Sequence, residues 1–192
     1  MADAPVYKAT LTKTIFERVG SLPAAEREAV LNRMDPANVA AIEQAARTDW
    51  LPAGVEADLD NAILEELGKD RLTEYVHEYT VRAADFPVFT PIARGAVNLF
   101  GGGPKGMLKI LPKTWGFVAR HCGACKYAEE GDAVVISYEG LPEVMRTPAF
   151  VAASEGGLTG VLEFVRAKGV TVQTDSRSIG SGTVRYTVRW ES

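Results

Sequence analysis

The stretch that decides the fold is residues 132–190, DAVVISYEGLPEVMRTPAFVAASEGGLTGVLEFVRAKGVTVQTDSRSIGSGTVRYTVRW. Its first apolar run, 133–138, is β-branched and aromatic, which predicts a strand. Residues 148–168 carry apolar side chains at helical spacing. Residues 170–174 and 183–190 then alternate in period two, which predicts an antiparallel hairpin. A strand, a helix and two strands in this order are typical of an α+β domain.

Upstream of this stretch, apolar residues recur at helical spacing and are interrupted by glycines and prolines. We therefore expect N-terminal helices followed by a helical bundle that packs on a small antiparallel sheet. Residues 1–50 are expected to form an N-terminal helical subdomain and 51–192 an α+β domain of ligand-binding type, together one continuous compact unit. Residues 50–54 are expected to be a loop with the side chain of Trp50 packed inward.

Four further helices are predicted in the middle of the chain, over 55–67, from Asp70 onward, over 87–99 and over 104–122. The last of these has an apolar face, and Pro112 lies inside it. Because proline lacks a backbone donor, we expect Pro112 to kink or split this helix. The helical segment 148–168 contains three glycines, Gly156, Gly157 and Gly160, which indicate that another backbone approaches closely. The flanking charges favour packing of this helix on the sheet.

The composition is that of an ordinary globular protein, with 46% hydrophobic and 24% charged residues in 192. The net charge is −4 and the Lys and Arg residues are dispersed, which argues against a nucleic-acid partner. The N-terminus lacks the basic and apolar regions of a signal peptide, and no apolar run is long enough to span a membrane. We expect a soluble, cytoplasmic protein.

The nearest approach to a chemical motif is the run His121-Cys122-Gly123-Ala124-Cys125. Its two thiols are three positions apart, at the predicted C-terminus of a helix, where the helix dipole disfavours a thiolate. A zinc site would use His121, Cys122 and Cys125 and would need a fourth ligand, and nothing places His77 within reach. We therefore expect that the protein binds no metal; if it did, His121, Cys122 and Cys125 would be the candidate ligands. We expect the side chain of Cys122 to be packed in the core as a small apolar group.

No motif of a familiar catalytic class is present. The glycine-rich run 101–106 lacks the spacing of a phosphate-binding loop, and the chain has no Gly-x-Ser-x-Gly run to carry a serine nucleophile. We expect that the protein is not an enzyme and has no catalytic residues.

Dispersed motifs resemble a family of domains of unknown function found in myxobacteria. The resemblance lies in Leu67-Gly68, in the run Phe89-Thr-Pro-Ile-Ala-Arg-Gly95, in Tyr138-Glu-Gly-Leu-Pro142 with the glycine-bearing helix after it, and in the closing Tyr186-Thr-Val-Arg-Trp190. It covers most of the chain beyond residue 10.

The order of helices followed by strand, helix and two strands is also remotely similar to a larger superfamily. This superfamily joins haem nitric-oxide sensor domains, four-vinyl-reductase domains and Bet3-like vesicle-tethering subunits. The resemblance implies an α+β domain that holds an apolar ligand between helices and sheet, often as a dimer. The haem sensors carry a Tyr-x-Ser-x-Arg run for the haem propionates, and the run at 174–178 does not match it. We therefore expect haem to be a doubtful cofactor and zinc not to be one.

Our leading hypothesis is a non-catalytic sensory module in bacterial cytoplasmic signalling that binds a hydrophobic small molecule. The residues expected to line the pocket are aromatic, aliphatic or flexible; they are Met107, Leu111, Trp115, Val118, Cys122, Phe150 and Phe164. Two alternatives remain open, a dimerising protein-interaction adaptor without a ligand, and a thiol or zinc protein that uses His121, Cys122 and Cys125. The expected partners are a hydrophobic small molecule or another protein, including a second copy of the chain.

Overall fold

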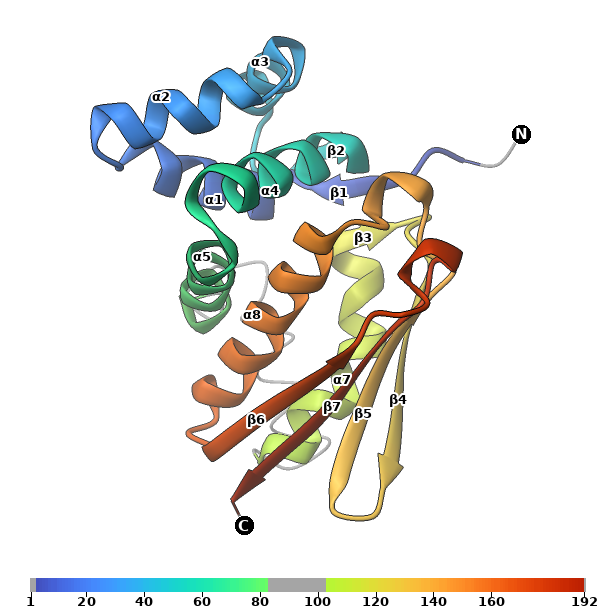
Figure 1. Cartoon of the computed structure of the whole chain (residues 1–192). Coiled ribbons are helices and arrows are strands. Elements are labelled where there is room, and N and C mark those ends of the chain that lie inside the picture. The colour runs from blue at the N-terminus through green and yellow to red at the C-terminus, as the bar shows by residue number, and fades with distance from the viewer. Residues whose placement is uncertain (1–2, 83–102, 192) are drawn as a thin grey trace.

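The four-stranded antiparallel sheet is the framework of the molecule (Figure 1). The computed structural model describes residues 3–82 and 103–191. The strand order is β4 (Ala124–Glu130), β5 (Ala133–Glu139), β7 (Val184–Glu191) and β6 (Lys168–Asp175), and each neighbouring pair is antiparallel. The predicted α+β class, the strand at 133–138 and the C-terminal hairpin are confirmed.

The alternation of β7 explains its central place in this sheet. Val184, Tyr186 and Val188 are fully buried, while Arg185 and Arg189, at alternate positions of the strand, point away from this buried face. In the register with β5, Tyr186 lies opposite Ile136, so both strands contribute to one apolar layer. The strand β4, in contrast, was not predicted, because its sequence ACKYAEE is mostly polar and mostly exposed at the edge of the sheet.

A second, three-stranded sheet has the order β2 (Trp50–Pro52), β1 (Val6–Lys8) and β3 (Ala119–Arg120). The prediction of a loop at 50–54 is therefore wrong, since the first three of these residues pair with β1. The indole of Trp50 is half-buried, and the cationic groups of Lys8 and Arg120 lie 4.6 Å and 4.0 Å from its ring centroid. This sheet joins the predicted subdomain 1–50 to the later chain; the division at residue 50 stays a prediction.

Seven α-helices surround the two sheets in the part of the chain that the structure describes. Their bounds are α1 (Ala9–Gly20), α2 (Ala24–Arg33), α3 (Pro36–Gln44), α4 (Ala53–Leu67), α5 (Lys69–Arg82), α7 (Pro104–Val118) and α8 (Pro148–Phe164). Short 3-10 helices, η2 (Glu143–Met145) and η3 (Ile179–Ser181), lie in the connections. In Figure 1, α8 runs alongside the four-stranded sheet next to β6, with α5 on its other side, while α2 and α3 lie at the end away from the four-stranded sheet.

Helix α7 differs from the prediction at its C-terminus. It ends at Val118, because Ala119 adopts an extended conformation and begins β3, whereas we expected helix as far as Cys122. It is also not split at Pro112, and a kink at this proline stays a prediction. The helix predicted over 87–99 lies outside the described residues.

The glycines of α8 allow α5 to approach closely. A Cβ atom added at Gly156 would lie 2.3 Å from the carbonyl oxygen of Thr73, and one at Gly160 would lie 2.8 Å from the carbonyl oxygen of His77. The expected close backbone is therefore present, but it belongs to a helix and not to the sheet. Two helices can pack at this distance only where the side chains between them are absent.

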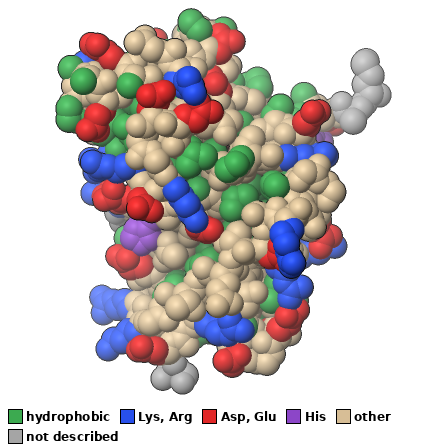
Figure 2. Space-filling view, viewed as in Figure 1, with side chains coloured by type: hydrophobic (Ala, Val, Ile, Leu, Met, Phe, Trp, Pro, Cys, Tyr) green, Lys and Arg blue, Asp and Glu red, His purple; other side chains and the backbone are tan. Residues whose placement is uncertain are grey.

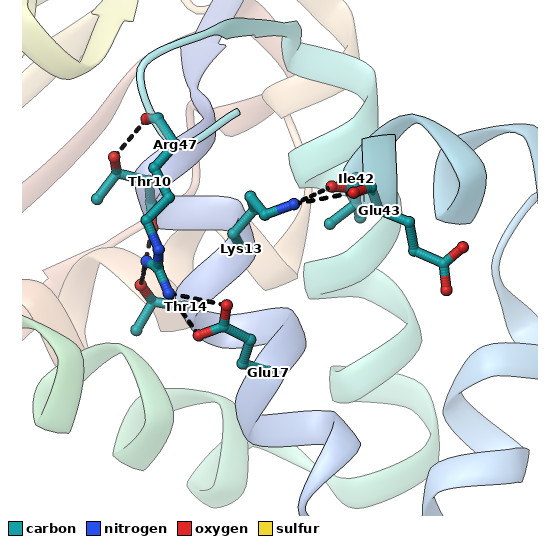
Figure 3. A network of polar contacts seen from close by, with 7 residues as sticks. All are labelled: Thr10, Lys13, Thr14, Glu17, Ile42, Glu43 and Arg47. Atoms are coloured by element: carbon teal, nitrogen blue, oxygen red, sulfur yellow. Dashed lines mark hydrogen bonds and ion pairs between the residues drawn. The ribbon is translucent and has the colours of Figure 1, made fainter. Parts of the chain in front are cut away.

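Polar contacts hold α1 against α3 and the segment that follows it (Figure 3). The ammonium group of Lys13 donates to the carbonyl oxygens of Ile42 and Glu43, at 2.7 Å and 3.1 Å, at the C-terminus of α3. The guanidinium group of Arg47 donates to both carboxylate oxygens of Glu17, at 2.8 Å and 2.6 Å. These contacts fix α1, whose opposite side faces the interior.

Charged side chains of both signs are scattered over the face shown in Figure 2, with no large area of one sign. The absence of a nucleic-acid partner stays a prediction. Within residues 3–82 and 103–191, no helix is both long and apolar enough to cross a membrane.

Candidate functional site

A cavity of about 260 Å³ lies between the helices and the sheets. Its walls come from α1, α4, α5, α7 and α8, together with β1, β5 and the connection that holds η2. The lining residues are mainly apolar; they are Tyr7, Leu11, Ile15, Ala53, Glu56, Ala57, Asp60, Val76, Tyr79, Thr80, Met107, Ile110, Leu111, Thr114, Trp115, Val118, Tyr138, Met145, Thr147, Phe150, Ala153, Ser154, Gly157, Leu158, Val161 and Phe164. Segments far apart in the sequence thus converge on one space.

Four aromatic rings form one wall of the cavity. Trp115 of α7 packs edge-to-face on Tyr138 of β5 with ring centroids 4.8 Å apart, and on Tyr7 of β1 at 5.9 Å. Phe150 of α8 packs on Tyr138 at 5.4 Å. The indole nitrogen of Trp115 also donates to the carbonyl oxygen of Gly123 at 3.3 Å, which restricts its orientation. This wall is aromatic and largely apolar, as suits a hydrophobic or aromatic ligand.

The polar part of the cavity is an acid pair, Glu56 and Asp60, one turn apart on α4. Their side chains face the cavity, yet the residues are only 8% and 5% exposed. One carboxyl oxygen of each, Glu56 Oε2 and Asp60 Oδ1, has no hydrogen-bond partner among the described residues. Buried oxygens without donors are rare in folded proteins because each costs free energy.

Burial controls the protonation of this acid pair. Loss of solvation raises the pKa of Glu56 from 4.5 to about 7, against a lowering influence of Thr12. Burial, and then the charge of Glu56, raise the pKa of Asp60 well above its ordinary value. Two neighbouring carboxyl groups in an apolar space cannot both ionise readily, so the empty cavity holds at least one of them protonated at neutral pH.

Burial also raises the pKa of Tyr7 well above its ordinary value, and the charges of Glu56, Tyr138, Cys122 and Asp60 add to this effect. The pKa of Tyr138 is also raised well above its ordinary value, first by burial and then by the charge of Cys125. Both phenols therefore stay protonated at physiological pH.

The structure brings six of the seven expected pocket residues to the cavity. They are Met107, Leu111, Trp115 and Val118 from α7, and Phe150 and Phe164 from α8. Cys122 is not among the lining residues. It follows β3, is fully buried, and its thiol lies 3.2 Å from the carbonyl oxygen of Arg120. Whether the six residues bind a ligand stays a prediction.

The run His121 to Cys125 occupies a turn and the first residues of β4, and not the end of a helix as we expected. His121 has a positive φ of 56° and an exposed side chain, 3.7 Å from the carboxylate of Asp3. Cys122 and Cys125 are buried free thiols. Burial raises the pKa of Cys122 to about 11 and that of Cys125 to about 12, so neither is a ready nucleophile.

The described residues contain no group of three or more His, Cys, Asp and Glu side chains that could hold a metal ion. The other histidine, His77 of α5, lies 2.8 Å from Glu163 of α8, where it bridges the two helices. Both histidines of the chain are therefore outside the cavity lining.

Sequence reasoning missed the contributions of α1, α4, α5 and the strands to the cavity. For Glu56 and Asp60 a signal existed, because they share the helical repeat of Leu59 and Ile63, which are fully buried. Two acids on the apolar face of a helix, without a basic residue one turn away, indicate a special environment. For Tyr7 and Leu11 no comparable signal exists, since only the tertiary fold brings them to the cavity.

Solved structures with the same architecture are H-NOX proteins. An H-NOX protein from K. algicida in the unliganded Fe(II) state has a TM-score of 0.66 and 8% identity, over 97% of this chain and 97% of that one. An H-NOX protein from S. oneidensis in the Fe(II)NO state has a TM-score of 0.62 and 10% identity, over 96% of this chain and 99% of that one. An oxygen-binding H-NOX domain related to soluble guanylate cyclases has a TM-score of 0.61 and 10% identity, over 96% of this chain and 95% of that one.

No protein-family profile and no curated protein matches the chain. The remote resemblance to haem nitric-oxide sensor domains is thus confirmed for the fold, while the myxobacterial resemblance stays a prediction. Our expectation that haem is doubtful is wrong, because proteins of this fold are described in Fe(II) states and in a study of haem distortion. The chain has the H-NOX fold, with a cavity between its helices and its sheet.

Proposed function

We propose that the protein is a non-catalytic sensory module that holds a largely apolar small molecule in the cavity between α4, α5, α7, α8 and the sheet. The observation that carries the proposal is the cavity itself, about 260 Å³ within a fold shared with H-NOX proteins. A cavity of this kind loses packing contacts that a filled core would make, so it is costly to keep without a ligand. Membership of the myxobacterial family and a role in bacterial signalling belong to the same proposal.

Haem is the cofactor that the fold implies. The cavity has the apolar and aromatic lining that haem would require, but it lacks cationic side chains among the described lining residues. The aromatic wall of Trp115, Tyr138 and Phe150 suits the faces of a porphyrin. Methionine is among the residues that bind haem iron in proteins, and Met107 and Met145 of the cavity would be the residues to hold it here. Among the lining residues that the structure describes there is no Lys or Arg for the propionates. When bound, haem would supply an iron atom able to take up a diatomic gas.

The test is titration of the purified protein with haemin, followed in the Soret region, together with native mass spectrometry of protein purified gently from its own cells. We expect a saturable Soret shift or a bound molecule in the native mass. Met107→Leu and Met145→Leu should change the spectrum of bound haem if either thioether binds the iron, with Met34→Leu, outside the cavity, as the control. A bare polypeptide mass together with the unchanged spectrum of free haemin would contradict the proposal.

The two alternatives remain predictions. Self-association without a ligand is tested by light scattering coupled to size exclusion, where a strict monomer would contradict it. A thiol or zinc role is tested by metal analysis and thiol titration of the wild type and of Cys125→Ser, where unchanged metal content and unchanged stability would contradict it.

A further inference from the structure

The acid pair on α4 is the feature of the cavity that apolar binding leaves unexplained. Glu56 and Asp60 line the cavity and are more than nine-tenths buried, and one carboxyl oxygen of each has no hydrogen-bond partner among the described residues. A buried oxygen without a hydrogen bond costs free energy of folding, and an apolar residue at either position would avoid this cost if the cavity bound only apolar groups. The pair therefore indicates a ligand that supplies the missing donors.

The described residues around the acid pair supply no positive charge to it. From other elements, Thr12 on α1 lowers the pKa of Glu56, and the charge of Glu56 raises the pKa of the phenols of Tyr7 on β1 and Tyr79 on α5. The described lining residues include no Lys, Arg or His that could neutralise a carboxylate. Glu56 lies in the first turn of α4, where the partial positive charge of the helix end favours an anion. The site is thus arranged to receive a cation rather than an anion.

The rest of the cavity defines the body of that ligand. Tyr7 links the two parts, since its phenol feels the charges of Glu56 and Asp60 while its ring packs on Trp115 at 5.9 Å. Beyond Trp115 the aromatic wall continues to Tyr138 and Phe150. A molecule with an ammonium group at one end and an aromatic or aliphatic body would satisfy both parts, because an ammonium has three donors and aromatic faces attract cations.

We propose that this cavity selects an apolar amine, whose protonated amino group binds the carboxyl groups of Glu56 and Asp60 while its body packs on the aromatic wall. This inference rests on the proposed function, because it names the class of ligand for the same cavity. The amine stabilises the ionised pair, so its binding at neutral pH expels a proton that the empty cavity held.

The experiment is calorimetric titration of the full chain with three compounds that share one body, phenylpropylamine, phenylpropanol and phenylpropionate. We expect the amine to bind at least about tenfold more tightly than the alcohol, and the carboxylate most weakly. Repeating the amine titration in buffers of different ionisation enthalpy should reveal proton release on binding. This second measurement uses only the wild type and does not depend on the folding of any variant.

Glu56→Gln and Asp60→Asn keep the shape of each side chain and remove its charge, and each should weaken amine binding by about tenfold or more while leaving the alcohol nearly unaffected. Glu65→Gln is the matched control, since Glu65 is on the same helix but exposed and paired with Arg33 outside the cavity. It should bind the amine as the wild type does.

The outcomes separate this inference from the proposed function. Equal binding of all three compounds, or a preference for the carboxylate, would leave a ligand-binding cavity but overturn the choice of an amine. Binding of haemin without binding of the amine would do the same. If neither haemin nor any of the three compounds binds, both the inference and the proposed function are contradicted.

Discussion

At the scale of single residues, the clearest consequence of the structure is a pH dependence carried by Glu56. Its pKa is raised from 4.5 to about 7, so between these values the folded protein keeps a proton that the unfolded chain has released. The free energy of unfolding of the ligand-free protein must therefore fall as the pH rises through this window, by roughly 3 kcal/mol. Asp60, whose pKa is also raised, adds to the fall in the same direction.

Chemical denaturation of the wild type and of Glu56→Gln at several pH values checks this prediction. The variant should lose much of the fall and should be at least as stable as the wild type above pH 7, because it has no charge to desolvate. Glu65→Gln should retain the wild-type dependence. Wild-type stability that stays level, or rises, across the window would show that the Glu56 carboxyl is not desolvated as described.

The two thiols give a second prediction at this scale. Cys122 and Cys125 are 0% and 7% exposed, and burial raises the pKa of both. Neither should react with a thiol reagent in the native protein at mildly alkaline pH, and both should react after unfolding. Titration with Ellman's reagent, with and without denaturant, measures this directly. Rapid reaction of one thiol in the native state would restore the redox hypothesis for the run 121–125.

At the scale of elements, the contact between α5 and α8 depends on the absence of two side chains. Gly156→Ala would place a methyl group 2.3 Å from the Thr73 carbonyl oxygen, and neither helix can move without disturbing its other contacts. We expect a loss of roughly 1–3 kcal/mol of stability. Gly157→Ala is the matched control, because the nearest atoms to its methyl group lie at 3.9 Å, and the gain in helix propensity should make it neutral or stabilising by up to about 1 kcal/mol.

Thermal or urea unfolding of the two variants gives the comparison. Equal stability of Gly156→Ala and the wild type would mean that α5 and α8 are farther apart than described.

The elements differ in how far the sequence predicts them. Helices α4, α5 and α8 and strands β5 and β7 follow from periodicity and from glycine and proline punctuation, because each has a clear apolar face. Strands β1, β2 and β3 have only two or three residues, and pairing across 40 or more positions defines them. Nothing in so short a segment distinguishes a strand from a loop. The partner of the α8 glycines was assigned to the sheet for a different reason, because the glycines indicate a close backbone without indicating which element supplies it.

At the scale of the whole molecule, the order of elements predicts the α+β class, and the apolar faces of α7 and α8 predict one side of the cavity. The other side could not be predicted, because Tyr7, Leu11 and Val76 join it only through long-range packing. The acid pair is the exception, since its position in the repeat of Leu59 and Ile63 is visible in the sequence. The cavity is thus a property of the assembled fold rather than of any one motif.

The central claim is that this cavity, and no other surface, receives the ligand. Its most direct test is saturable fluorescence binding of the apolar probe N-phenyl-naphthylamine to the wild type, to Ala153→Phe and to Ala25→Phe. Ala153 lines the cavity on α8, whereas Ala25 is exposed on α2. We predict that the wild type and Ala25→Phe bind the probe equally and that Ala153→Phe, with the cavity filled, remains folded and binds it weakly. Equal binding by all three proteins, or no saturable binding by the wild type, would contradict the account.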